Sequence, residues 1–176
     1  MVIQGNYLEF AMLSMFSSLA RYNGWANAIL FEDAAKADPA CLMAARPVDF
    51  GSMFGVLNHV LLADRLWLHR LTGEGVAPAG VGGLVADSLE ALLALRQAED
   101  ARLLAFAAGL SASRLEETLH YHTISGQPMA LPVTVCVMQL FNHQTHHRGQ
   151  VHGLLGLCGA AVRDIDFVYF ARDHQG

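Results

Sequence analysis

Residues 133–157 read VTVCVMQLFNHQTHHRGQVHGLLGL, and this stretch predicts the architecture of the chain. Apolar residues recur every three or four positions along it, as they do in an amphipathic helix, and Pro132 suits the first turn of a helix. The β-branched run Val133–Val137 has strand propensity, but strands of this length are rare. We therefore predict a long last helix that ends before Gly159.

This helix carries a histidine pair within Asn142–Gln150, NHQTHHRGQ. His143 and His147 are four positions apart, so their side chains leave one helix face about 6 Å apart along the axis. Two imidazoles at this spacing can bind one divalent ion at about 2.0–2.1 Å. His146 projects about 100° away from His147, and we do not expect it to share the ion. Surface histidines also occur at this spacing by chance, so the pair alone leaves metal binding open.

A third ligand should come from a facing helix, where His59 in Leu57–Leu62 is the best candidate. Buried neutral imidazoles without partners would each cost a few kcal/mol, and a shared ion relieves that cost. A lone histidine in an apolar helix is more often a hydrogen-bonded core residue, so this alternative also stays open. The helical wheel places the following residues on the inward face of the last helix: Cys136, Gln139, Leu140, His143, His147, Gln150 and Leu154.

Three earlier segments have the same helical period, and turn-rich sequence separates them. The predicted helices are 7–36, 52–73 with Ser52 and Gly73 as caps, and 88–109. The connection 74–86 is a glycine-rich loop, and 117–131 is a short hairpin with Ser125–Gly126 as its turn. These elements predict an all-α protein: an up-down four-helix bundle with one elaborate connection before the last helix, in a single domain over residues 1–176.

Polar residues in the third helix are expected on its solvated outer face. They are Glu90, Arg96, Glu99, Asp100 and Arg102.

Composition and charge exclude several classes of partner. The chain has 176 residues, with 16 acidic and 11 basic residues and a net charge of −5, and the basic residues are scattered singly. No basic stripe could neutralise phosphates, which argues against nucleic acid as a partner. No run of eighteen apolar residues predicts a membrane span. The hydrophobic content of 53% favours a self-association face and an oligomer.

The cysteines and the N-terminus predict the compartment. Cys41, Cys136 and Cys158 are odd in number and form no CxxC pair. We expect all three to be reduced, buried thiols. The N-terminal sequence has no basic region followed by an apolar block, so no secretory signal is indicated, and we expect a cytoplasmic protein.

Several motifs together resemble the DinB family, a group of DinB/YfiT-like proteins regarded as metalloenzymes, and the resemblance covers nearly the whole chain. The motifs are HQTHHRGQ at 143–150, RYNGWAN at 21–27, Asn58-His59 followed by Asp64 and Trp67, and DFVYFA at 166–171. The resemblance implies a four-helix bundle, commonly a homodimer. It implies a divalent ion held by His59 of the second helix and by His143 and His147 of the last. Gln150 is expected to support a ligand, and Arg148 to be a structural or dimer-face residue.

Relatives with a known activity use a low-molecular-weight thiol such as mycothiol or bacillithiol, and three histidines leave a coordination position open. We therefore expect a metal-dependent enzyme with a small-molecule substrate, a thiol-dependent S-transferase in which the histidines act only as ligands. No other catalytic residue is assigned. Zinc and nickel are the favoured ions, although iron and copper also accept imidazoles.

Two alternatives remain. A metal-dependent hydrolase would need a general base, and the nearest acid in the sequence is Asp64, five residues from His59. A stress-associated, non-catalytic protein would use the ion to join helices. Such a site normally has four protein ligands, and His122 is a candidate for the fourth.

Overall fold

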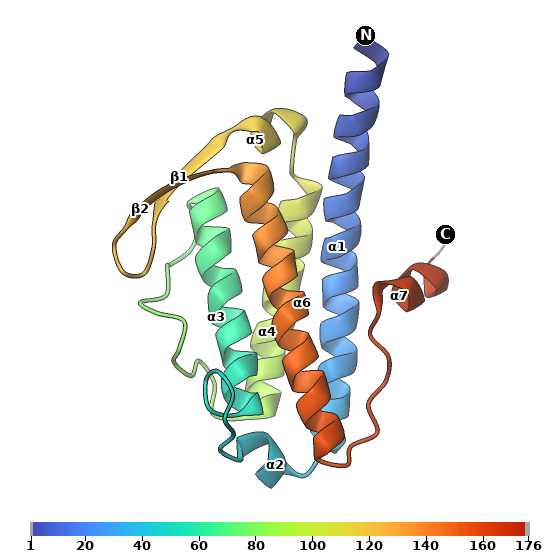
Figure 1. The fold of residues 1–176 in the computed structure, drawn as a ribbon, viewed down its shortest axis with the longest axis vertical. Helices are drawn as coiled ribbons and strands as arrows, with labels where there is room; N and C mark the ends of the chain where they lie inside the picture. The colour runs from blue at the N-terminus through green and yellow to red at the C-terminus, as the bar shows by residue number, and fades with distance from the viewer. Residues whose placement is uncertain (1, 175–176) are drawn as a thin grey trace.

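The computed structural model describes residues 2–174, which form a mostly helical structure with one small sheet (Figure 1). The elements of this part are α1 (Val2–Lys36), α2 (Pro39–Met43), α3 (Met53–Thr72), α4 (Leu89–Ala108), α5 (Ala112–Glu116), β1 (Thr118–His122), β2 (Pro128–Pro132), α6 (Val133–Leu157) and α7 (Phe167–Asp173). The four long helices and the hairpin confirm the sequence prediction, whereas the short helices α2, α5 and α7 were not predicted. Between residues 2 and 174, no helix combines the length and apolar character that crossing a membrane requires.

Local sequence fixes the ends of α3 as predicted. The Ser52 hydroxyl accepts a hydrogen bond from the Gly55 N–H at 3.0 Å, which satisfies a free donor of the first turn. At the other end, Gly73 adopts a φ of 75° and donates its N–H to the His69 carbonyl at 2.7 Å. Glycine reaches this left-handed conformation without a side-chain clash, so the helix ends there.

The long helices pack so that α1 and α3 each lie against both α4 and α6. One core cluster joins the first half of α1, the ends of α3 and α4, and the start of α6; its members include Phe16, Leu71, Leu103 and Val133. The second cluster joins the opposite ends of these helices and includes Leu30, Met53, Leu92 and Leu155. Helices α1 and α6 therefore run in one direction, and α3 and α4 run in the other (Figure 1).

The parallel course of α3 and α4 differs from the up-down order, in which consecutive helices alternate. Segment 73–88 makes this course possible by returning along the side of the molecule (Figure 1). Sixteen extended residues can span about 50 Å, whereas a helix of about 20 residues is about 30 Å long. The glycine-rich sequence identifies this segment as a loop, but composition does not say which end of the structure the loop reaches.

The predicted outer face of α4 is partly wrong. Glu90 and Arg102 are exposed as expected, but Arg96 and Glu99 are each only 2% exposed. Each has a partner on α3, where Asp64 pairs with Arg96, and Arg65 pairs with Glu99 at 3.5 Å. A helical wheel treats every charged residue as solvated, and it cannot anticipate a buried ion pair.

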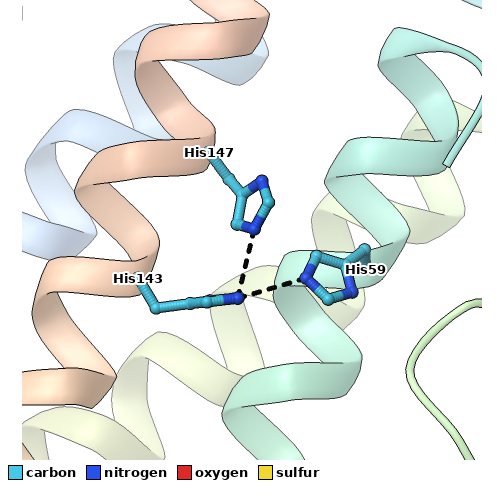
Figure 2. Close-up of side chains that lie close together, drawn as sticks. All are labelled: His59, His143 and His147. Carbon is cyan, nitrogen blue, oxygen red and sulfur yellow. Dashed lines mark hydrogen bonds between the residues drawn. The ribbon is translucent and has the colours of Figure 1, made fainter. Parts of the chain in front are cut away.

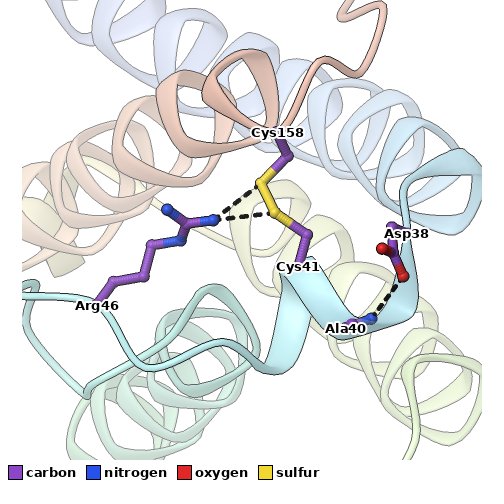
Figure 3. The surroundings of a disulfide bond; sticks show 5 residues. All are labelled: Asp38, Ala40, Cys41, Arg46 and Cys158. Carbon is purple, nitrogen blue, oxygen red and sulfur yellow. Dashed lines mark hydrogen bonds between the residues drawn. A yellow bond between two sulfur atoms is a disulfide. The ribbon is translucent and has the colours of Figure 1, made fainter.

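The expectation of three reduced thiols is corrected by a disulfide between Cys41 and Cys158 (Figure 3). This bond joins α2 to the residue that follows α6. The Arg46 guanidinium lies against both sulfur atoms at 3.0 and 3.2 Å. Cys136 is free and buried, as predicted. A separation of 117 residues carries no information about proximity in space, so the pairing could not be deduced from spacing.

Candidate metal centre

The structure brings together the three histidines named as candidate ligands, from two facing helices (Figure 2). The Nε2 atom of His143 lies 3.1 Å from Nε2 of His59 and 3.1 Å from Nε2 of His147. Of the residues that the structure describes, these three form a group whose ligand atoms all lie within 4.8 Å of one another. His59 and His147 are buried, and His143 is partly exposed.

The second nitrogen of two rings fixes which nitrogen faces the centre. His59 donates its Nδ1–H to the Val81 carbonyl at 2.8 Å, since a carbonyl can only accept. His147 donates its Nδ1–H to Oε1 of Gln150 at 2.7 Å, which supports the expected role of Gln150. Each neutral ring then presents the lone pair of its Nε2. His143 can donate one proton to only one of these two nitrogens. Hydrogen bonding within the trio of His59, His143 and His147 therefore leaves at least one Nε2 lone pair without a donor.

The donor set fits a divalent cation. Two nitrogens that bind one zinc ion tetrahedrally at about 2.0–2.1 Å lie about 3.3 Å apart. The observed separations of 3.1 Å are close to this value. Hydrogen bonds from Nδ1 to a carbonyl and to an amide oxygen are the supports that histidine ligands normally have.

Electrostatics keep these rings neutral, as metal ligands must be. Burial, together with the neighbouring His147, His59 and His146, lowers the pKa of His143 to about 4. Burial also lowers the pKa of His59 and His147. All three imidazoles therefore keep a free lone pair at neutral pH, and a cation has little proton competition.

Other residues considered for the site lie outside the trio. His146 is exposed, as expected of a residue that shares no ion, and His122 is exposed on β1. Gln139 is also exposed, which contradicts its predicted inward position. The buried stripe of α6 instead includes Gln144 at 0% and Arg148 at 3% exposure. The inward face is thus rotated by about one residue from the predicted one, and His143 lies at its edge.

Gln144 and Arg148 belong to a buried polar network that joins all four long helices. Gln144 donates to Asp64 of α3, and Asp64 also accepts from Arg96 of α4. Arg148 donates to Asn23 of α1. Asn27 donates to Asp100 at 2.9 Å, and Arg96 pairs with Asp100 at 3.0 Å. Each metal-ligand candidate on α6 is therefore followed directly by a residue that anchors the helix to its neighbours.

Two loops supply further residues around the trio, and the sequence reasoning did not find them. The Phe50 ring stacks on the His59 imidazole, with centroids 3.6 Å apart and planes inclined by 12°. Val81 contributes only its backbone carbonyl, which no side-chain motif can reveal. Burial lowers the pKa of His59 and His147, and the charge of Asp49, from the same loop as Phe50, partly opposes this effect at both rings.

Comparisons with known proteins give a family match and a structural neighbour. The sequence model of the DinB family matches residues 12–175. A crystal structure of a DinB-like protein from Bacillus cereus superimposes with a TM-score of 0.59, at 22% sequence identity, over 87% of this chain and 94% of that one. At this identity the likeness shows the fold alone. None of the curated proteins matches the chain.

Proposed function

Because the chain belongs to the DinB family and gathers three histidines at one point, we propose that His59, His143 and His147 bind a divalent metal ion. The convergence of the three Nε2 atoms carries this proposal, since two of them present lone pairs fixed by hydrogen bonds at Nδ1. Zinc and nickel are the ions we favour, and iron and copper also accept imidazole donors. We also infer that α1, α3, α4 and α6 form a four-helix bundle around the centre, which their mutual packing supports.

We propose that this centre serves a thiol-dependent S-transferase acting on a small molecule. In this reaction a C–S bond forms between the thiol and an electrophile, the leaving group departs with its bonding electrons, and the thiol proton passes to solvent. A bound divalent ion would supply a lowered thiol pKa at its open position. The protein contributes three neutral rings held in place by Val81, Gln150 and the polar network.

Hydrolysis is the second candidate, and the environment of the acidic residues bears on it. Asp64 is fully buried and paired with Arg96, so it is poorly placed to serve as a general base. The exposed Asp49, whose charge acts on two of the histidines, could accept a proton from a bound water. A purely structural ion would need a fourth protein ligand, and the expected candidate His122 is not part of the trio.

Metal analysis of protein purified without a nickel column tests the binding proposal. We expect about one divalent ion per chain in the wild type, and none in His143→Ala or His147→Ala. His146→Ala is the matched control, because this exposed neighbour lies outside the trio and should keep the ion. Equal metal content in all three variants would refute the assignment.

Activity assays then separate the reactions. The loaded protein is incubated with a small thiol and a chlorodinitrobenzene, and in parallel with an activated ester without thiol, each with and without chelator. A chelator-sensitive thioether product supports the transferase. Chelator-sensitive ester hydrolysis that is lost in Asp49→Asn supports the hydrolase instead. If the chelator abolishes neither activity, the result favours a structural ion.

We also propose a homodimer that forms through the N-terminal half of α1. This part of α1 extends beyond the other helices (Figure 1), and Tyr7 and Phe10 are 76% and 71% exposed there. They line, with Met15 and Phe167, a groove of about 600 Å³. Burial of these rings against a second copy would remove a large apolar surface from water. Sedimentation should show a dimer that Phe10→Glu converts to monomer, and a monomeric wild type would contradict the proposal.

A further inference from the structure

The loop before α3 holds Phe50 in an unusual backbone conformation. Phe50 has a φ of 62°, in the left-handed region that is unfavourable for a residue with a side chain. Its carbonyl oxygen lies close to α3, where a methyl group at position 55 would overlap it, so glycine is required there. The position of Phe50 therefore requires a strained backbone at Phe50 itself and a glycine at position 55.

The Phe50 ring lies at the candidate metal centre. One face stacks on the imidazole of His59 at 3.6 Å, and the ring also meets His147 edge-on at 6.0 Å. The residue nevertheless remains 37% exposed. One face of the ring thus packs on a candidate ligand, while part of the residue is exposed to solvent beside the trio.

Hydrogen bonds within the loop hold Phe50 in this position. The Arg46 N–H donates to the Gly51 carbonyl at 2.8 Å, and the Gly51 N–H donates to the Val48 carbonyl at 3.1 Å. The side chain of Arg46 reaches the disulfide that joins Cys41 to the end of α6 (Figure 3). Because these contacts hold the loop before any ligand arrives, binding against the ring would require little ordering of the protein.

We propose that Phe50 determines substrate specificity: its open surface binds a flat apolar or aromatic group of a small molecule whose polar donor group sits at the three Nε2 atoms. This inference rests on the proposed metal centre and names the class of compound that it accepts. Aromatic groups pack on aromatic rings in stacked or edge-on geometry and gain more than burial alone provides. A backbone conformation that costs stability, beside a candidate reactive centre, is consistent with a role in binding.

Binding of two metal-directed probes to the cobalt-loaded protein tests the proposal without any turnover. Benzohydroxamate and acetohydroxamate share one metal-binding group, but benzohydroxamate also carries an aromatic ring. The visible spectrum of the bound cobalt reports the binding of each compound. We expect the wild type to prefer benzohydroxamate by about three- to tenfold, the range of a single aromatic contact. Phe50→Ala and Phe50→Gly should reduce this preference towards unity while cobalt affinity stays within about threefold of the wild type.

Two controls separate specificity from packing. Val168→Ala removes an exposed apolar side chain from α7, which lies beside α1 and across the molecule from α3 (Figure 1), and should keep the full preference. In the metal-free protein, Phe50→Gly should be more stable towards urea than Phe50→Ala, because glycine adopts the positive φ without strain.

Each outcome bears on one claim. An unchanged benzohydroxamate preference in cobalt-loaded Phe50→Ala and Phe50→Gly overturns the specificity role. Loss of cobalt from both variants also overturns it, since Phe50 would then serve only to hold His59. A wild type that binds no cobalt instead refutes the metal centre itself, and the specificity role falls with it.

Discussion

Removal of Asp64 should destabilise the protein more than removal of any exposed acid. Asp64 is fully buried and accepts hydrogen bonds from Arg96 and Gln144. Breaking one partner out of a buried ion pair costs about 3–5 kcal/mol, because the remaining charge is left uncompensated. Arg96 keeps a second contact with Asp100 at 3.0 Å, so we expect the lower end of that range. The lost acceptor of Gln144 adds about 1 kcal/mol. For Asp64→Ala we therefore predict a loss of about 3–4 kcal/mol.

The assay is urea unfolding of the metal-free protein at about pH 8. Burial raises the pKa of Asp64 to about 7, so the wild-type carboxyl is ionised under these conditions. A double-mutant cycle with Arg96→Met isolates the pair, and Asp87→Ala is the matched control because Asp87 is exposed. The double variant should be more stable than the sum of the single losses predicts, by about 1–3 kcal/mol.

Two results would contradict this reasoning. A loss below about 1 kcal/mol for Asp64→Ala would mean that water or another group compensates Arg96. Additive losses in the cycle would mean that the two side chains act independently, and the buried network would then not be a connected unit.

Further predictions concern pH, the disulfide and two glycines. The folded-state pKa of His143, about 4, is below its unfolded value, so the metal-free protein should lose stability as the pH falls from about 6.5 towards 4. We expect a loss of about 2 kcal/mol after allowance for partial exposure of the ring. His143→Ala should show a shallower loss over the same pH range. Cys41→Ser removes a covalent link across 117 residues and should lower the free energy of unfolding by about 4 kcal/mol, measured by thermal unfolding. If the predicted cytoplasmic location is right, thiol trapping in intact cells should find this bond reduced. Gly55→Ala should destabilise the fold by about 1–3 kcal/mol in urea, whereas Gly153→Ala, in open space on α6, should be neutral or stabilise it by up to about 1 kcal/mol.

Local chemistry made the helices and their ends predictable from sequence. Ser52 and Gly73 cap α3 through contacts within a few residues, and these need no knowledge of the rest of the fold. The spacing of His143 and His147 likewise fixes their common face within one helix. His59 was found because an imidazole in an apolar helix needs a partner, which is a physical requirement that sequence can reveal.

The parts that sequence did not predict depend on contacts between distant segments. Gln144 looks like a surface residue until Asp64 of α3 is placed beside it, and the family motif that gave Arg148 a structural or dimer-face role did not name its partner Asn23. The positive φ of Phe50 likewise follows from tertiary packing against α3. The direction of α4 depends on the course of a long loop, which the sequence leaves free.

The alternation of candidate ligand and anchoring residue along α6 limits how the proposed centre could be transferred to another protein. His143 and Gln144 are adjacent, as are His147 and Arg148, so one helical turn faces the trio on one side and the buried charges on the other. A slide or rotation of α6 would disturb both sides at once. An engineer who grafts only the three imidazoles onto a different scaffold should therefore obtain weak, loosely defined coordination, and would need to transplant the neighbouring amide and guanidinium with their acceptors.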